Sequence, residues 1–305
     1  MTGAHQEAFL PPRCLDLSLL QMASHYDLSQ KSERRRSARD LAGFFLRAAK
    51  VVEADLFIEV GAKEASASHR ARSYLPQSRV VAFEANPYTF EKFQGENPES
   101  TGVEYYHLAV SDRPGPVTFH VRLHPEGSPR PDGHGSLLER DDSYEHDFDE
   151  VTVDSTTLDI FFAYEEFKRC AMWVDVEGAS EAVLSGGRSV LSKAAIVIIE
   201  VEDRALWKGS WTAPEVTRCL AEVGLFPVAR DFEYAYQYNV VFVRESLLND
   251  PLLRLRLAQH FSARTAASQA NGADTQGISG GRKRGLLRRT MKWPRQQMQR
   301  TLRAH

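Results

Sequence analysis

The stretch FIEVGAKEASASH, Phe57 to His69, decides the fold class of this chain. An apolar run ends in an acid and a single glycine, and small residues that suit the first turn of a helix follow. Nucleotide-binding α/β folds begin in this way, with a strand, a glycine turn and a helix. The second glycine of such a turn is missing, because Lys63 and Ala65 occupy this segment. The first question is therefore whether the turn still binds a cofactor.

Strand-like and helix-like segments alternate after this stretch. The predicted strands are 55–60, 79–84, 103–110, 170–176 and 194–202, and the predicted helices are 41–52, 66–75, 87–94, 156–167, 180–193 and 213–224. Several strands are apolar on both faces, which indicates a parallel sheet covered by helices on each side. Two last strands, 225–230 and 238–245, have no helix between them and predict an antiparallel hairpin at an edge.

A hairpin arm is predicted in the middle of the chain at 115–123, and a further short strand is predicted at 150–155. The segment between them is rich in glycine, proline and acids, and loops of this length inside a domain are usually lids or binding loops. Its chemically useful residues are His134, Asp141, Asp142, His146 and Asp147. A histidine there could act as a base near neutral pH. The alternative is that all of them are solvated loop residues.

Ligands of an open parallel sheet bind beyond the carboxyl ends of the strands. Glu84 ends the second strand, where an acid typically accepts hydrogen bonds from ribose hydroxyls. A pyrophosphate would need several glycines in the first turn, and it would be repelled by Glu64. The pattern therefore favours an adenosine ligand without phosphate, namely the positively charged S-adenosylmethionine. A nicotinamide-dependent oxidoreductase is disfavoured by the single glycine and by the absence of a Tyr-x-x-x-Lys pair.

The composition suits a globular protein of a reducing compartment. Hydrophobic residues make up 42% of the chain, and no apolar run is long enough to span a bilayer. The three cysteines, Cys14, Cys170 and Cys219, are far apart and show no metal-binding spacing. The first residues do not have the pattern of a signal peptide. We therefore expect a cytoplasmic location.

The charge is unevenly distributed along the chain. The net charge is −3, but the segment from Thr275 onward carries nine basic residues and no acid, which leaves −12 for residues 1–274. An acidic body is not the footprint of a nucleic-acid-binding domain. The basic tail could lie on an anionic membrane surface, which would make the protein peripheral to the membrane, or it could be a soluble extension. No motif predicts an oligomeric state.

Five motifs occur in the order of a known family: FIEVGA, VVAFEANPYTFEKF, YHLAVSDRPGPVTFHV, STTLDIF and MWVDVEGASEAVLSGGRSVLSKAAIVIIEVE. They resemble the FkbM-type methyltransferases, which are class I S-adenosylmethionine-dependent O-methyltransferases. The match covers about Ala54 to Glu245, and VDVEGASEAVLSGG is its most specific part. The resemblance implies a doubly wound, Rossmann-like sheet of seven strands with the last strand antiparallel. It also implies S-adenosylmethionine as cofactor and a hydroxyl of a sugar, glycan or glycosylated metabolite as acceptor.

Composition and the resemblance together predict a domain organisation, and the resemblance implies a set of site residues. The methyltransferase domain would cover 37–250, after an extension over 1–36 and before a helix end and disordered linker over 251–281 and a basic tail over 282–305. The implied cofactor contacts are Glu59, Gly61 and Ala62 at the methionine part, Glu84, Ala85 and Asn86 at the ribose, and Ala109 and Ser111 at the adenine, with Asp175 and Glu177 at the reacting centre.

The opening turn departs from the family pattern, in which an Asn stands near Lys63 and a Gly near Ala65. Alanine costs little where the backbone is helical and much where φ is positive. Two interpretations stay open. Either the turn works, or the protein is a cofactor-deficient scaffold or glycan-binding protein with a methyltransferase fold.

Methyl transfer to a hydroxyl requires alignment of donor and acceptor and removal of a proton. Asp175 is the first candidate, either as the base or as the ligand of a divalent metal ion. Glu177 and Glu202 are further candidates for a catalytic carboxylate. Aromatic side chains in the last third could stack on a sugar or could pack in the core; they are Trp207, Trp211, Tyr234, Tyr236 and Tyr238.

Overall fold

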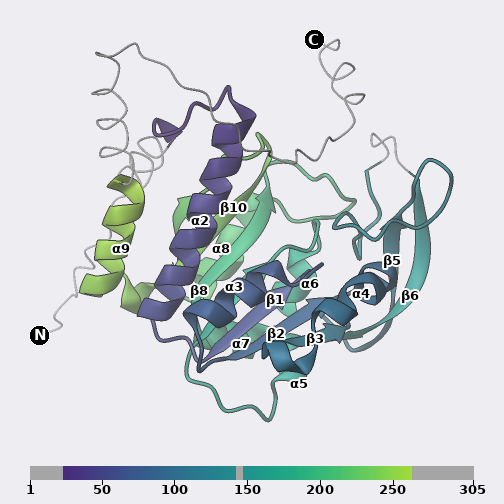
Figure 1. Cartoon of the computed structure of the whole chain (residues 1–305), viewed down its shortest axis with the longest axis horizontal. Helices are drawn as coiled ribbons and strands as arrows, with labels where there is room; N and C mark the ends of the chain where they lie inside the picture. The colour runs from purple at the N-terminus through teal and green to yellow at the C-terminus, as the bar shows by residue number, and fades with distance from the viewer. Residues whose placement is uncertain (1–22, 142–146, 263–305) are drawn as a thin grey trace, which may run out of the picture. The chain divides into compact units, whose positions relative to one another are not determined.

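The computed structural model describes residues 23–141 and 147–262 of the chain. Its doubly apolar strands form a seven-stranded sheet in the order β3-β2-β1-β7-β8-β10-β9 (Figure 1). The strands are β1 Leu56–Val60, β2 Arg79–Glu84, β3 Glu104–His107, β7 Cys170–Val174, β8 Ala194–Glu202, β9 Leu225–Arg230 and β10 Gln237–Arg244. Neighbours pair in parallel, except that β10 is antiparallel to both β8 and β9. The predicted fold class is thereby confirmed, including the antiparallel last strand and the hairpin at the edge.

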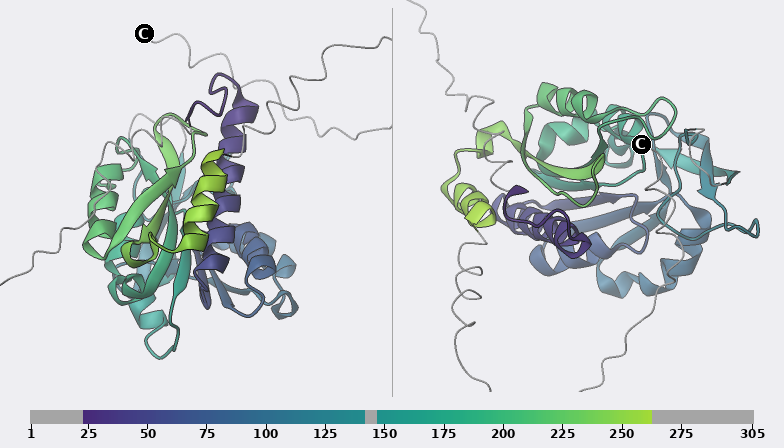
Figure 2. Two further views of the ribbon diagram at one scale, coloured as in Figure 1. Left: turned by 90° about the vertical axis from the view of Figure 1, so that its left-hand side faces the viewer. Right: turned by 90° about the horizontal axis from the view of Figure 1, so that it is seen from above.

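Helices cover both faces of this sheet (Figure 2). On one face lie α2 Lys31–Val51, α3 Ser66–Tyr74 and α9 Pro251–Ser262, with α4 Pro87–Phe93 packed on β2 and β3. On the other face lie α5 Leu158–Phe161, α6 Ser180–Ser185, α7 Arg188–Lys193 and α8 Ala213–Glu222. Short 3-10 turns occupy Gln94–Glu96, Glu99–Thr101 and Glu245–Leu247.

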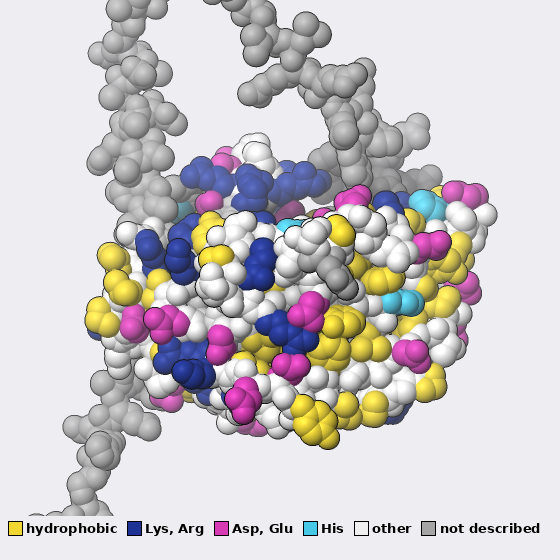
Figure 3. Space-filling model, turned by 60° about the horizontal axis from the view of Figure 1, so that its bottom comes forward, with side chains coloured by type: hydrophobic (Ala, Val, Ile, Leu, Met, Phe, Trp, Pro, Cys, Tyr) yellow, Lys and Arg dark blue, Asp and Glu magenta, His cyan; other side chains and the backbone are white. Residues whose placement is uncertain are grey.

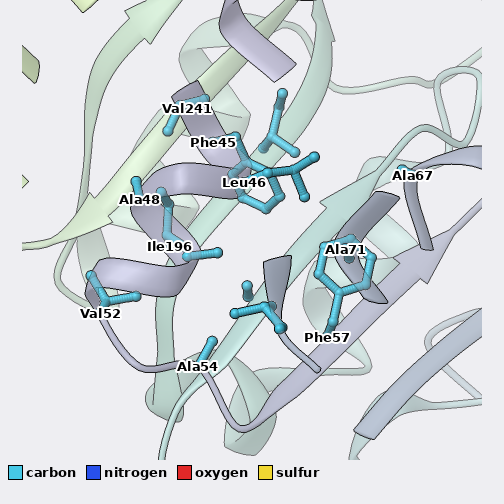
Figure 4. Packing of buried hydrophobic residues seen from close by; sticks show 14 of the residues in the cluster. Phe45, Leu46, Ala48, Val52, Ala54, Phe57, Ala67, Ala71, Ile196 and Val241 are labelled. Atoms are coloured by element: carbon cyan, nitrogen blue, oxygen red, sulfur yellow. The ribbon is translucent and has the colours of Figure 1, made fainter. Parts of the chain in front are cut away.

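Side-chain alternation along the strands divides the core into two layers. Phe57 of β1 points toward α2 and α3, where its ring lies 6.3 Å from that of Phe45 (Figure 4). Its neighbour Ile58 points to the opposite layer, which α5 to α8 cover. This alternation also decides on which face each strand-end acid projects.

A smaller three-stranded sheet stands beside the large one, in the order β4-β6-β5. Its strands are β4 Ala109–Val110, β5 Gly115–Arg122 and β6 Phe148–Thr156, and β5 pairs with β6 in antiparallel fashion. The predicted hairpin arm and short strand are therefore present, and the structure pairs them with each other. Of the loop between these two strands, residues 123–141 and Asp147 are described. The candidates Asp142 and His146 lie outside the described residues.

The helix predicted over 180–193 is wrong as a single element, because it is broken into α6 and α7 at Gly186 and Gly187. A Cβ atom at Gly186 would lie 2.1 Å from the carbonyl oxygen of Ser111. Gly186 therefore allows the backbone after β4 to approach the helices closely, whereas Gly187 makes room for Leu158.

The helix predicted over 156–167 is also too long, since α5 ends at Phe161. The carboxylate of Asp55 accepts hydrogen bonds from the backbone N–H groups of Lys168 and Arg169, at 2.8 Å and 3.0 Å. These contacts direct the chain into β7. They are long-range contacts, which a local helical pattern does not contain.

Helices lie at both ends of the predicted methyltransferase domain, and they do not stop at its predicted boundaries. α2 already begins at Lys31, so the boundary predicted between residues 36 and 37 falls inside a helix. α9 packs against α2, with the ring of His260 stacked on Phe44 at 4.8 Å. The domain boundaries stay predictions, and the linker from residue 263 and the basic tail over 282–305 lie outside the described residues.

The surface of the described part mixes charges of both signs. Figure 3 shows one face on which Lys and Arg side chains alternate with acids and with hydrophobic side chains. None of the helices in the described part is long and apolar enough to cross a membrane.

Candidate active site

A cavity lies at the carboxyl ends of β1, β2, β4 and β7, where the fold class places its ligands. Its lining includes six of the residues predicted to contact the cofactor: Gly61, Glu84, Ala85, Asn86, Ala109 and Asp175. These residues come from four separate strand ends. The predicted Glu59, Ala62 and Ser111 are not part of the lining.

Gly61 allows the strand ends to meet. Its φ is +80°, and a Cβ atom there would lie 1.7 Å from the carbonyl oxygen of Asp175. The N–H groups of Gly61 and Ala62 donate to the carbonyl of Phe83, at 3.0 Å and 2.9 Å. The N–H of Asp175 donates to the carbonyl of Val60 at 2.9 Å. The backbone around Gly61 thus connects the end of β1 to both neighbouring strands, β2 and β7.

The two unusual residues of the turn both adopt left-handed backbone, with φ of +49° at Lys63 and +57° at Ala65. This is the conformation in which a side chain is costly. The turn nevertheless remains attached to the site, because the N–H of Lys63 donates to Oε2 of Glu84 at 2.6 Å. Lys63 and Ala65 therefore leave the backbone of the turn strained, while the turn keeps its contact with Glu84.

Glu84 is fixed by backbone donors. Its Oε1 accepts from the N–H of Asn86 at 2.7 Å, and its Oε2 accepts from the N–H of Lys63. Asn86 in turn caps α4 by accepting from the N–H groups of Tyr88 and Thr89. Burial raises the pKa of Glu84 to about 7. Each carboxylate oxygen keeps a further acceptor position, so the group can still bind two hydroxyls of a ligand.

Glu59 lies under α3 instead of facing the cavity. It shares its side of β1 with Phe57, because side chains alternate along a strand. Its carboxylate accepts from the N–H groups of Ala67 at 3.3 Å and Ser68 at 2.7 Å, which are otherwise unpaired donors of the first turn of α3. Burial raises the pKa of Glu59 to about 7. Its place in the fold is that of a helix cap.

Asp175 lies beside a second carboxyl, that of Glu200. The register of β7 and β8 pairs Val174 with Ile199, so the next residues along each strand are neighbours. The two side chains interact, and burial raises the pKa of Asp175 to about 7 and that of Glu200 well above its usual range. Gln237 of β10 donates to Glu200 Oε1 at 2.8 Å. The only sequence signal for this pair is the alternation of side chains along β8. It places Glu200 on the same face of the strand as Ile196 and Ile198.

Glu177 joins the central loop to the site. Its φ is +48°, and its carbonyl accepts from Oγ of Ser136 at 2.7 Å. Its Oε1 lies 3.3 Å from Nδ1 of His134, and its Oε2 lies 3.5 Å from Nε2 of Gln237. Of the loop histidines that are described, His134 is therefore the one that a site carboxylate holds in place.

Glu202 is buried at the carboxyl end of β8. Its Oε2 accepts from the N–H of Leu206 at 3.1 Å, and it is not part of the cavity lining. The neighbouring Trp207 is only 1% exposed, and a Cβ atom at Gly178 would lie 2.4 Å from its ring. Trp207 therefore packs in the interior and cannot stack on a sugar.

The remaining aromatic candidates separate into buried and exposed residues. Tyr238 is buried, and its hydroxyl donates to Asp203 at 2.6 Å. Tyr234 and Tyr236 are 56% and 53% exposed, in the turn between β9 and β10. The predicted stacking platform is therefore reduced to these two tyrosines, with Trp211 half-buried.

Part of the lining was not predicted from the sequence. Lys63 lines the cavity, and the second sheet and its loop contribute Phe119, Asp132 and Leu137. Asp132 forms an ion pair with Arg122 and accepts from the N–H of His134 at 3.0 Å. The loop has no hydrophobic period, so its position depends on such contacts. Its Gly133 and Gly135 are the only local signal of a close approach.

A metal site finds no support in this geometry. Within residues 23–141 and 147–262, no three His, Cys, Asp or Glu side chains are placed so as to hold a metal ion. Asp175, the residue predicted as a ligand if a metal were bound, lies beside Glu200.

Comparisons with known proteins agree with the strand-end motifs. A family model described as the Methyltransferase FkbM domain matches residues 55–238. The 2-O-methyltransferase NoeI of Sinorhizobium fredii is 23% identical over 160 residues, which cover 50% of this chain and 66% of that protein. The chain therefore spans slightly less than two thirds of this relative.

Two solved structures of methyltransferases are distantly similar. The methyltransferase FkbM of Methylobacillus flagellatus has 11% identity and a TM-score of 0.40, over 62% of this chain and 44% of that chain. The magnesium protoporphyrin IX methyltransferase of Synechocystis has 9% identity and a TM-score of 0.39, over 72% of this chain and 84% of that chain. Since the family model spans more than half of the sequence and the strand-end motifs line one cavity, this protein belongs to the FkbM methyltransferase family.

Proposed function

We propose that this protein transfers a methyl group from S-adenosylmethionine to a hydroxyl of a sugar, a glycan or a glycosylated metabolite. The observation that carries the proposal is the cavity in which Glu84 and Asp175 meet an apolar wall. Membership of the FkbM family supports the methyl transfer. The name of the relative NoeI, a 2-O-methyltransferase, supports oxygen as the acceptor atom.

The residues of the cavity fit the cofactor in their chemistry. Glu84 would accept the two ribose hydroxyls, and Ala109, Phe119 and Leu137 would pack against the adenine. Asp175 would stand near the positive charge of the donor, which favours its ionised form. When bound, S-adenosylmethionine supplies a methyl group on a sulfonium. Every other requirement of the reaction falls on the chain itself.

The proton of the acceptor hydroxyl needs a group that takes it up near neutral pH. The buried Asp175 has a pKa raised to about 7, which suits a general base, and Glu200 lies beside it to share the proton. His134, held at Nδ1 by Glu177 and flanked by the lining residues Gly133 and Gly135, is a second candidate to take up the proton. In this scheme Glu177 is a positioning residue, and Glu202 supports the turn that leads to Leu206.

The acceptor would enter from the side of the β9–β10 turn. Tyr234 and Tyr236 are exposed there, and Gln237 at the start of β10 contacts both Glu177 and Glu200. Tyrosine faces offer an apolar surface with a polar edge, which suits a sugar. We further propose peripheral membrane contact through the basic tail, which would bring a lipid-linked glycan to the site, in a cytoplasmic protein without nucleic-acid partners.

Cofactor binding is the first test. Calorimetric titration with S-adenosylhomocysteine should show binding to the wild-type chain and loss of binding in Glu84→Ala. Lys92→Met is the matched control, because Lys92 is an exposed residue of α4 outside the cavity, and it should bind like the wild type. A folded wild-type protein that binds no S-adenosylhomocysteine would favour the alternative of a cofactor-deficient scaffold or glycan-binding protein.

The acceptor is tested once binding is established. The enzyme, supplied with methyl-labelled S-adenosylmethionine, is offered a panel of oligosaccharides and their derivatives in which single hydroxyls are blocked. Label should enter a sugar hydroxyl, and blocking that hydroxyl should abolish the transfer. Label that enters only amines or thiols would overturn the assignment of a hydroxyl acceptor.

A further inference from the structure

The lining of the cavity carries one cationic side chain among the described residues, that of Lys63. The other ionisable groups of the lining are the acids Glu84, Asp132 and Asp175. Asp132 is already paired with Arg122 and lies 3.4 Å from Nε of Arg130. Lys63, Glu84 and Asp175 therefore remain to contact a ligand, and Glu84 is the residue assigned to its ribose.

S-adenosylmethionine carries three charges, on its sulfonium, its α-amino group and its α-carboxylate. Asp175 can meet the positive charge, since Glu84 is assigned to the ribose, but the α-carboxylate needs a cation or a hydrogen-bond donor. We propose that Lys63 binds the α-carboxylate of S-adenosylmethionine, an inference that rests on the proposed function. Lys63 then gives the cofactor a charged contact near the position where the family pattern has a polar residue.

The position of Lys63 supports this role. Its backbone amide is bonded to Glu84, the residue assigned to the ribose, so its side chain starts next to the cofactor. The stem passes the loop at Gly133, where a Cβ atom would lie 3.5 Å from Cδ of Lys63. Its positive charge also acts on Asp175 and on Glu84, since it lowers the pKa of both carboxyls against the effect of burial.

The other contact of the ammonium group does not compete strongly. Nζ lies 3.6 Å from Oε2 of Glu64, and the two side chains are 46% and 39% exposed. Ion pairs with such exposure contribute little to stability. The left-handed backbone of Lys63 is a strained conformation, and strain of this kind is concentrated at ligand sites.

The test compares two ligands that differ in the amino-acid part. S-adenosylhomocysteine has the α-carboxylate, whereas 5′-methylthioadenosine has the same nucleoside and no amino-acid group. The variant Lys63→Met keeps an unbranched stem as far as the ε carbon and keeps the strained Cβ, with sulfur at the δ position, and it removes the ammonium. It should weaken S-adenosylhomocysteine by about tenfold to a hundredfold, the size expected for a charged hydrogen bond, and leave 5′-methylthioadenosine unchanged.

Each other outcome would overturn the proposal. Equal weakening of both ligands would mean that Lys63 acts through the shape of the turn, and unchanged binding of both would mean that it does not touch the cofactor. A wild-type protein that binds neither ligand would overturn the proposed function itself, and the inference with it. Lys92→Met is again the control, and thermal melting of each variant checks that it is folded.

Discussion

A single glycine holds the candidate site together. Gly61 has left-handed backbone, and any Cβ atom there would collide with the carbonyl of Asp175 at 1.7 Å. Gly61→Ala should lower the free energy of unfolding by about 3 kcal/mol or more, because strain and overlap add. Urea denaturation measures this. Gly95→Ala is the control, since no atom lies within 4 Å of its Cβ position, and a similar loss there would refute the argument.

Lys63 presents the opposite case, a side chain where glycine would fit better. Its φ of +49° is a conformation that glycine adopts without strain. We expect Lys63→Gly to raise the free energy of unfolding by about 1 kcal/mol. The same variant should bind S-adenosylhomocysteine more weakly, because the ammonium is lost. Chemical denaturation and calorimetry on one preparation measure both effects, and a loss of stability would contradict the assignment of strain.

At the scale of elements, α3 depends on a carboxylate of the strand before it. Glu59 accepts the N–H groups of Ala67 and Ser68, and α3 has no side-chain cap of its own. Glu59→Leu would leave these donors buried without partners and should cost about 2 to 4 kcal/mol. Glu59→Gln keeps an acceptor and should cost less.

The cap assignment has a second consequence for binding. Since Glu59 lies outside the cavity, Glu59→Gln should leave the affinity for S-adenosylhomocysteine unchanged, whereas Glu84→Gln should weaken it. Both are measured by calorimetry. A loss of affinity in Glu59→Gln at unchanged melting temperature would restore Glu59 to the cofactor contacts.

The elements differ in how far the sequence predicts them. β2 and β8 match their predicted ranges, because both are largely apolar runs of a length that suits a strand. The break between α6 and α7 follows from a backbone contact with Ser111, which is distant in sequence. The residues of the site differ in the same way. Glu84 and Asp175 are predicted from their positions at strand ends, whereas Asp132 and Leu137 reach the site through tertiary contacts of their loop.

At the scale of the whole molecule, the sheet gathers buried acids on one face. Glu59, Glu84 and Asp175 come from three strands, and burial raises the pKa of each to about 7. In the unfolded chain such groups titrate near pH 4. Between these values the folded protein binds more protons than the unfolded chain. Its stability therefore falls as the pH rises through this window.

We expect the free energy of unfolding of the ligand-free protein to be higher at pH 5 than at pH 7.5. His260 acts in the opposite direction, because burial lowers its pKa to about 4 and the unfolded chain then binds the extra proton. The lowered pKa values of Glu104, Asp132 and Glu215 act in the same direction as His260, but these carboxyls titrate mainly below pH 5 in both states, so the fall with rising pH should prevail. Urea midpoints at several pH values measure the slope, and Glu59→Gln should make it shallower because the amide does not titrate. Stability that rose from pH 5 to pH 7.5 would mean that the pKa values of these carboxyls stay near their ordinary range in the folded protein, and Asp175 would then be a weaker base than the proposed function requires.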